Sequence, residues 1–122
     1  MAVNVMIVDD LAFIKFVLRD ILDKAGFRVV GEASNGDEAI RVYLDKRPDV
    51  VLMDITMPGM DGLTALKKIR EHDPAARIII CSALGQQRLI VQAIQLGAKD
   101  FIVKPFQPQR IISALKKALD IV

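Results

Sequence analysis

The stretch VVLMD at residues 50–54 sets four apolar side chains directly before an aspartate. A short run that is apolar throughout, without alternating polar residues, is typical of a strand buried on both faces of a parallel sheet. Comparable runs recur along the chain and also end in polar residues: VMIVDD (residues 5–10), RIIICS (77–82) and DFIVK (100–104). The repeated pattern predicts a parallel sheet whose faces are covered by helices.

Between these runs the apolar residues recur at helical spacing, so strand and helix alternate along the whole chain. Residues 28–33 are rich in β-formers and supply one further strand. The strands are therefore predicted at 5–8, 28–33, 50–53, 77–81 and 100–103. The helices are predicted at 11–24, from the turn at 34–37 to near Pro48, and at 63–71, 86–96 and 108–120. In the first helix the residues at helical spacing are Phe13, Phe16, Val17, Ile21 and Leu22.

Five βα units predict an α/β protein, a three-layer sandwich with the sheet in the middle. A chain of 122 residues with 52% hydrophobic side chains is long enough for one compact domain and too short for two, so a single domain is predicted over residues 1–122. Right-handed crossovers bring the carboxyl ends of parallel strands to the same edge of the sheet, where such sheets bind ligands.

The composition argues against several functions. The formal net charge is +2 and the basic side chains are scattered, without the clustered stripe that nucleic-acid binding requires. The start of the chain has no basic leader and only a brief apolar stretch, so neither a secretory signal nor membrane insertion is predicted, and a cytoplasmic location is expected. The single cysteine, Cys81, excludes an internal disulfide and is interpreted as a buried packing residue.

Chemically active side chains follow four of the predicted strands. Asp9 and Asp10 follow the first strand, Asp54 the third, Ser82 the fourth and Lys104 the fifth. Carboxylates gathered at one edge suit a divalent cation such as Mg²⁺, which prefers hard oxygen ligands. A hydroxyl and an ammonium beside them can bind a phosphoryl group, and a carboxylate can be its acceptor. The second strand runs into Ser34 and Asn35, which are interpreted as turn and cap residues.

Taken in order, these segments resemble the receiver domains of two-component signalling, and within that family the stand-alone regulators of chemotaxis. The resemblance covers essentially the whole chain, and its specificity comes from the motifs occurring together. They are VMIVDD (5–10), MDITMP (53–58), Asp61-Gly62, Ser82-Ala83 and Lys104-Pro105-Phe106. The resemblance implies a flavodoxin-like, doubly wound fold with a five-stranded parallel sheet and five helices.

The resemblance also implies a role for each active side chain. Asp54 would accept a phosphoryl group from a sensor histidine kinase, and Lys104 and Ser82 would contact the phosphoryl oxygens. Asp9, Asp10 and Asp54, with the backbone carbonyl of Thr56, would hold Mg²⁺. The chain would phosphorylate and dephosphorylate itself without being an enzyme for other substrates. The only histidine, His72, lies at the end of a predicted helix and is not expected to donate the phosphoryl group.

Readout of phosphorylation is implied for the face made by the fourth helix, the fifth strand and the fifth helix. Ser82 would move toward the phosphoryl group, and Phe101 would rotate into the space that it leaves. Relatives often carry tyrosine at the Phe101 position, so a hydrogen bond from that ring to a partner would be lost. In the family the peptide bond before Pro105 is cis and orients the lysine inward, although sequence alone does not reveal the isomer.

Two further positions depart from the family pattern. Lys15 stands where many relatives carry arginine. Leu84, two residues after Ser82, is expected to shield the acyl phosphate from water and so to slow its hydrolysis.

Other functions stay open at this point. A flavin-binding module would need a Ser/Thr/Gly-rich phosphate loop, whereas residues 9–13 are acidic and bulky. An aspartyl-phosphate phosphohydrolase ordinarily carries its nucleophile after the first strand and has a cap domain. A receiver-like binding module that is never phosphorylated would usually lack the acceptor or the lysine.

Among signalling partners, the flagellar motor switch protein is expected. A phosphorelay that passes the phosphoryl group to a histidine phosphotransfer protein is the alternative, and a phosphatase is a further candidate partner.

Overall fold

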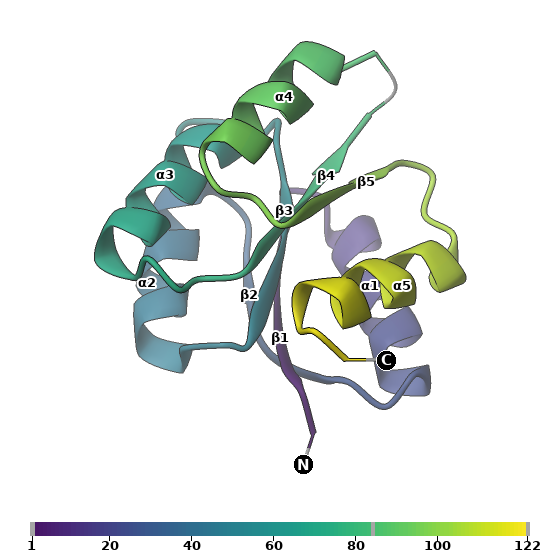
Figure 1. The fold of residues 1–122 in the computed structure, drawn as a ribbon. Coiled ribbons are helices and arrows are strands. Elements are labelled where there is room, and N and C mark those ends of the chain that lie inside the picture. Colours follow the sequence, from purple (N-terminus) through teal and green to yellow (C-terminus); the bar gives the residue numbers. More distant parts are fainter. Residues whose placement is uncertain (1, 84, 122) are drawn as a thin grey trace.

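A five-stranded parallel sheet lies between two layers of helices in the computed structural model, which describes residues 2–83 and 85–121 (Figure 1). The strands are β1 (Asn4–Val8), β2 (Arg28–Ala33), β3 (Val50–Asp54), β4 (Ile78–Ser82) and β5 (Asp100–Val103). The helices are α1 (Ala12–Lys24), α2 (Gly36–Lys46), α3 (Gly62–His72), α4 (Gln87–Gln95) and α5 (Pro108–Ala118). Every predicted element is present, with its ends within two residues of the prediction. None of the helices in the described part of the chain is long and apolar enough to cross a membrane.

The strand order across the sheet is β2-β1-β3-β4-β5, and each neighbouring pair is parallel. The chain adds β2 on one side of β1 and then continues with β3 on the other side, so the order reverses between β1 and β3. This arrangement confirms the predicted three-layer sandwich and its flavodoxin-like topology. Ligands of such sheets bind where the loops after the two reversing strands separate.

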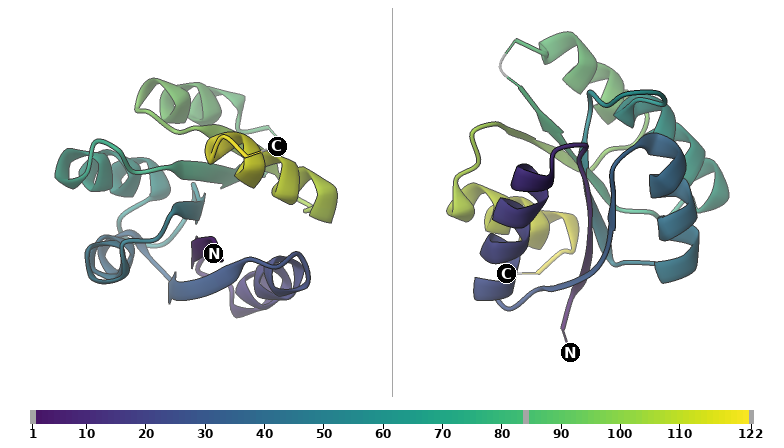
Figure 2. Two further views of the ribbon diagram at one scale, coloured as in Figure 1. Left: turned by 60° about the horizontal axis from the view of Figure 1, so that its bottom comes forward. Right: turned by 180° about the vertical axis from the view of Figure 1, so that it is seen from behind.

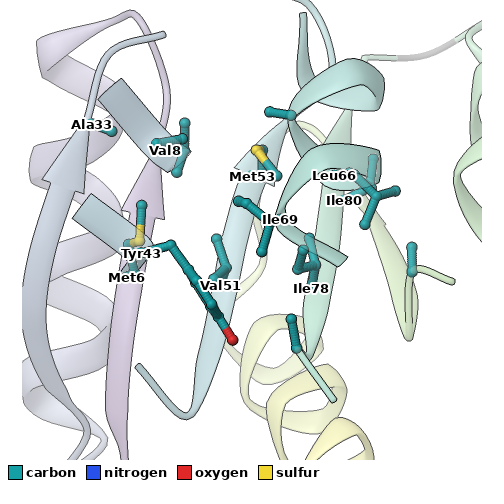
Figure 3. Close-up of a cluster of buried hydrophobic side chains, with 14 of the residues drawn as sticks. Met6, Val8, Ala33, Tyr43, Val51, Met53, Leu66, Ile69, Ile78 and Ile80 are labelled. Carbon is teal, nitrogen blue, oxygen red and sulfur yellow. The ribbon is translucent and has the colours of Figure 1, made fainter. Parts of the chain in front are cut away.

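The sheet divides the interior into two hydrophobic clusters that share no side chain. Helices α1 and α5 cover one face, while α2, α3 and α4 cover the other (Figure 2). Met6 and Met53 belong to the second of these layers, as does Tyr43 of α2 (Figure 3). The neighbouring strand residues Ile7 and Leu52 belong to the first. Each central strand is therefore buried on both faces, which explains its unbroken apolar sequence.

Side-chain caps start two of the helices at the edge of the sheet that carries the strand carboxyl ends. The Asn35 side chain accepts a hydrogen bond of 2.9 Å from the Glu38 N–H, and the Ser34 N–H donates to the Glu38 carboxylate at 2.6 Å. Glu38 thus returns a hydrogen bond to the residue before the N-cap, a variant of the capping box, and the predicted turn and cap role of Ser34 and Asn35 is confirmed. Asp61 caps α3 in the same way by accepting from the Thr64 N–H at 2.8 Å.

Two apolar residues whose spacing predicted α1 do not face the core. Phe13 and Phe16 are 72% and 65% exposed, whereas Leu18 and Leu22 are fully buried. The helix lies where their spacing predicted it, but Phe13 and Phe16 do not mark its buried face, because their stripe continues at helical spacing into Asp20 and other charged residues. A helix can bury only one such stripe against a sheet.

Candidate phosphoryl and metal site

Two carboxylates meet where the strand order reverses. Asp9 directly follows β1, and Asp54 is the last residue of the adjacent strand β3. These two residues are 1% and 6% exposed, whereas Asp10, one residue further along, is not buried. Each of the three offers a carboxylate oxygen, and these three oxygens lie within 4.8 Å of one another. The structure thus brings together the acidic residues that the sequence placed at one edge.

Asp9 is fixed by its own backbone and by the next turn of chain. Its N–H continues the sheet by donating to the Ala33 carbonyl at 3.0 Å. One carboxylate oxygen accepts from the Leu11 N–H at 2.9 Å, and the other lies 3.2 Å from the Lys104 ammonium. Both oxygens therefore have defined partners, which holds the carboxylate in one orientation.

Lys104 connects the two buried carboxylates. Its Nζ lies 3.2 Å from Asp9 Oδ2 and 3.4 Å from Asp54 Oδ1. Its N–H donates to the Ser82 carbonyl at 2.8 Å, and the Lys104–Pro105 bond is cis, as the resemblance implied. Burial lowers the pKa of Lys104, but the carboxylates of Asp54 and Asp9 outweigh burial, so the pKa is raised. The side chain is therefore a firm positive charge in the site.

Asp54 is held in an environment that disfavours its charge. Burial raises the pKa of its carboxyl group, and nearby Asp9 raises it further, although Lys104 acts in the opposite direction. One ammonium faces three carboxylates, so the site lacks positive charge. Carboxylate oxygens are the ligands that Mg²⁺ prefers, and a divalent cation would relieve their repulsion, so the residues fit this ion.

The Ser82 hydroxyl lies at the end of β4, beside β3, because Asp54 pairs with Cys81 in the ladder. It is fully buried, and its Oγ has no hydrogen-bond partner among the described residues. A buried hydroxyl without a partner is costly, and it is available to donate to an incoming group.

Phe101 lies on the same face of the sheet as Ser82, the face that α4 covers. The ring is half-buried and borders a hollow of about 320 Å³ whose other walls include Ile90 and Val91 of α4. Ser82 and Phe101, the residues predicted to form the switch, thus share one face of the sheet, and Ala83, the residue after Ser82, lines the hollow beside the ring.

The sequence assigned no role to Gly62, which lies against the backbone of Asp54. Its N–H donates to the Ile55 carbonyl at 2.7 Å, and a Cβ at this position would lie 2.2 Å from the Asp54 carbonyl oxygen. Only glycine allows this close approach of two backbones. The signal available in the sequence was a glycine placed directly after the capping Asp61.

Gln86 was also missed, although the sequence shows it within Gly85-Gln86-Gln87. Its Oε1 accepts from the Ala83 N–H at 2.7 Å, and its Nε2 donates to Thr56 Oγ1 at 2.9 Å. No pattern in the sequence indicates these contacts, because they depend on how two loops meet.

The remaining positions singled out from the sequence lie outside this cluster. Lys15 donates to Ser34 Oγ rather than to the carboxylates. His72 is the exposed last residue of α3. Cys81 is buried, and burial raises the pKa of its thiol to about 12, in keeping with a packing role. Leu84, with its predicted effect on hydrolysis, lies outside the described residues.

Fold and site together define a receiver domain. A doubly wound parallel sheet carries an acidic cluster where its strand order reverses, and a lysine contacts two carboxylates of that cluster. The family model of the response regulator receiver domain matches residues 5–116, and the chain belongs to this family.

Curated relatives and solved structures agree with this assignment. The chain is 56% identical to "Chemotaxis protein CheY" of Thermotoga maritima, over 96% of this chain and 98% of that protein. It is 57% identical to the Bacillus subtilis protein of the same name, over 98% and 100%. The CheX-CheY-BeF3-Mg+2 complex from Borrelia burgdorferi contains a chain with a TM-score of 0.90 and 40% identity, over 93% of this chain and 87% of that one. The chain is thus a CheY-like receiver over nearly its whole length.

Proposed function

We propose that the chain is a phosphorylation-activated switch of chemotaxis signalling that accepts a phosphoryl group on Asp54. The observation that carries the proposal is the buried Asp54 carboxylate, which lies beside Asp9 and within 3.4 Å of the Lys104 ammonium. The similarity of the chain to proteins named for chemotaxis supports the same signalling role. The phosphodonor is a histidine of a sensor kinase.

In the transfer step, an Asp54 carboxylate oxygen attacks the phosphorus in line. The new P–O bond forms as the P–N bond to the donor histidine breaks, and the imidazole leaves with the electron pair and takes up a proton. Lys104 then shares its charge with a phosphoryl oxygen, and the unpartnered Ser82 hydroxyl donates to another.

Asp9, Asp10, Asp54 and the Thr56 carbonyl would hold Mg²⁺. When bound, the ion would neutralise negative charge as the anionic donor approaches. The acidic cluster supports this assignment, as does the named Mg²⁺ complex of the similar Borrelia chain.

The output follows from the shared face of Ser82 and Phe101. When the Ser82 hydroxyl turns toward the phosphoryl group, the Phe101 ring can rotate inward and change the surface of α4, β5 and α5. A flagellar motor switch protein is the proposed reader of this surface. A phosphatase is a further proposed partner, and the similar Borrelia chain is in complex with a second protein, CheX. We place this action in the cytoplasm, and assign residues 1–122 to one domain whose chemistry is limited to its own acyl phosphate.

A direct test is intact-mass spectrometry after incubation with acetyl phosphate and Mg²⁺, with Asp54→Asn as the control. We expect one phosphoryl adduct on the wild type that requires Mg²⁺ and is absent from the variant. An adduct that persists in Asp54→Asn, or no adduct with any donor, would reject the proposal.

The phosphorelay alternative is tested with the same adduct. Transfer of the group to a histidine phosphotransfer protein would favour a relay. Phosphorylation-dependent binding to a motor switch protein, without such transfer, would favour the direct switch.

A further inference from the structure

We propose that Gln86 is a latch that holds the unphosphorylated arrangement and that phosphorylation of Asp54 displaces it. The inference rests on the proposed function and adds a positioning residue to it. It starts from the two hydrogen bonds of the Gln86 side chain, one to the loop after β3 and one to the loop after β4.

The latch extends the connection between β3 and β4 beyond the sheet. The ladder of these strands ends with the Ile55 N–H donating to the Cys81 carbonyl at 3.1 Å. One residue further on, the Gln86 amide joins Thr56 to Ala83 with bonds of 2.9 and 2.7 Å. The loop that carries the acceptor and the loop that carries Ser82 are therefore tied together at the site.

The Gln86 side chain does not cap the helix at whose start it lies. Gln86 is the N-cap of α4, yet its side chain makes no capping hydrogen bond. The N-caps of α2 and α3, Asn35 and Asp61, both bond to their own helices. Glutamine is a poor N-cap, and here its amide serves the contact between loops instead.

Phosphorylation competes with the latch because a backbone N–H is a single donor. The Ala83 N–H lies next to Ser82, so these two donors stand at the strand end beside Asp54. The N–H now donates to Gln86, whereas the Ser82 hydroxyl has no hydrogen-bond partner in the described part of the chain. A phosphoryl group on Asp54 offers charged oxygens, which are stronger acceptors than a neutral amide oxygen. Donation to them releases Gln86.

Release of Gln86 would change the surroundings of the Phe101 ring. Gln86 lines the same hollow as Phe101, together with Ile90 and Val91. While the latch is closed, the amide is a fixed part of the wall. When it opens, the wall changes on the side that faces the ring, and this gives the site a second route to the output face besides the Ser82 hydroxyl.

The test uses beryllofluoride with Mg²⁺ as the probe of the phosphorylated arrangement. Gln86→Met keeps the length of the side chain and removes both hydrogen bonds. Gln87→Met is the matched control, because Gln87 is exposed and its side chain has no hydrogen bond among the described contacts. We expect Gln86→Met to bind beryllofluoride about 5-fold more tightly than the wild type, the effect of one net hydrogen bond. The control should bind like the wild type.

Two further readouts separate a latch from a merely structural role. In the free Gln86→Met protein, the Ala83 amide and Phe101 ring resonances should move toward their positions in the beryllofluoride-bound wild type. Thr56→Val removes the other end of the latch, so the double variant should bind no more tightly than either single variant. Fully additive gains would show that the two side chains act separately, and would overturn the latch.

Failure of the latch is distinguishable from failure of the proposed function. If the wild type binds beryllofluoride through Asp54 but Gln86→Met binds equally or more weakly, the latch alone is wrong. If the wild type shows no Asp54-dependent binding, the proposed function is wrong, and the latch falls with it.

Discussion

At the scale of single residues, the charge of Asp54 couples stability to pH. Burial and Asp9 raise the pKa of its carboxyl group above the value in the unfolded chain. The folded state therefore binds the proton more tightly, so this contribution to stability is full below the ordinary aspartate pKa and is lost as pH rises through the raised pKa. In Asp54→Asn this loss should disappear, and the metal-free variant should be more stable than the wild type by about 1 kcal/mol at neutral pH.

The measurement is urea unfolding without metal, at steps from about pH 4 to about pH 8. Other carboxylates add their own pH dependence, so the informative quantity is the difference between variant and wild type at each pH. That difference should grow as pH rises. Asp23→Asn, on the exposed side of α1, serves as the control. A difference that stays constant would contradict the assigned cause.

Gly62 should tolerate no side chain. In Gly62→Ala the new Cβ would meet the Asp54 carbonyl oxygen at 2.2 Å and the Ile55 Cα at 2.8 Å, so the backbone of Asp54 itself would have to move. We expect a loss of stability of about 2–4 kcal/mol by chemical denaturation, together with slower phosphorylation of the folded fraction. Gly59→Ala meets no atom within 4 Å, although its φ of +73° adds strain, and is a milder comparison. Equal losses of stability in the two variants would contradict the view that the close contact of Gly62 with the Asp54 backbone causes the loss.

The residues of the site differ in how far the sequence could predict them. The proximity of Asp9, Asp54 and Lys104 could be predicted because each follows a strand, and parallel strands end at one edge. Their roles in phosphoryl transfer remain predictions. Gly62 and Gln86 could not be assigned a role in this way, because their contacts depend on the path of loops rather than on the period of an element.

At the scale of elements, α1 offers a test of which stripe supports the fold. Leu18 is buried against the sheet, whereas Phe13 and Phe16 are largely exposed. We expect Leu18→Ala to cost about 3 kcal/mol in the free energy of unfolding. The double substitution Phe13→Ser and Phe16→Ser should change it by less than about 1 kcal/mol, despite removing far more apolar surface. A large loss from the double variant would place the phenylalanines in the core after all.

The contrast between strands and α1 shows where pattern reading succeeds. The central strands are buried on both faces, so nearly any apolar run of that length indicates them. An amphipathic helix buries only one face against a sheet, and in α1 apolar residues lie on two faces. The charges further along the helix, beginning with Asp20, were the signal that could have resolved the choice.

At the scale of the whole molecule, the proposed Mg²⁺ site predicts that folding is sensitive to this ion. An ion that binds only the folded state stabilises it by about 2.7 kcal/mol at a concentration 100-fold above its Kd. We expect Mg²⁺ to raise the free energy of unfolding accordingly, and Asp9→Asn to reduce the gain strongly. Sodium chloride at matched ionic strength is the control for general screening. An equal gain from the sodium salt, or an unchanged gain in Asp9→Asn, would contradict a specific site.

The division of the interior by the sheet has a consequence for how such a sequence can diverge. Since the two hydrophobic clusters share no side chain, a volume lost in one can be restored only by its own members, for example Leu18 by residues of α5. Compensating substitutions should therefore pair up within a layer and rarely across the sheet. Ser82 and Phe101 belong to the layer of α4, and Asp54 points toward the layer of α1 and α5. Substitutions in the packing around Asp54 can thus accumulate over generations without altering the surface of α4 and β5 that is proposed to bind partners.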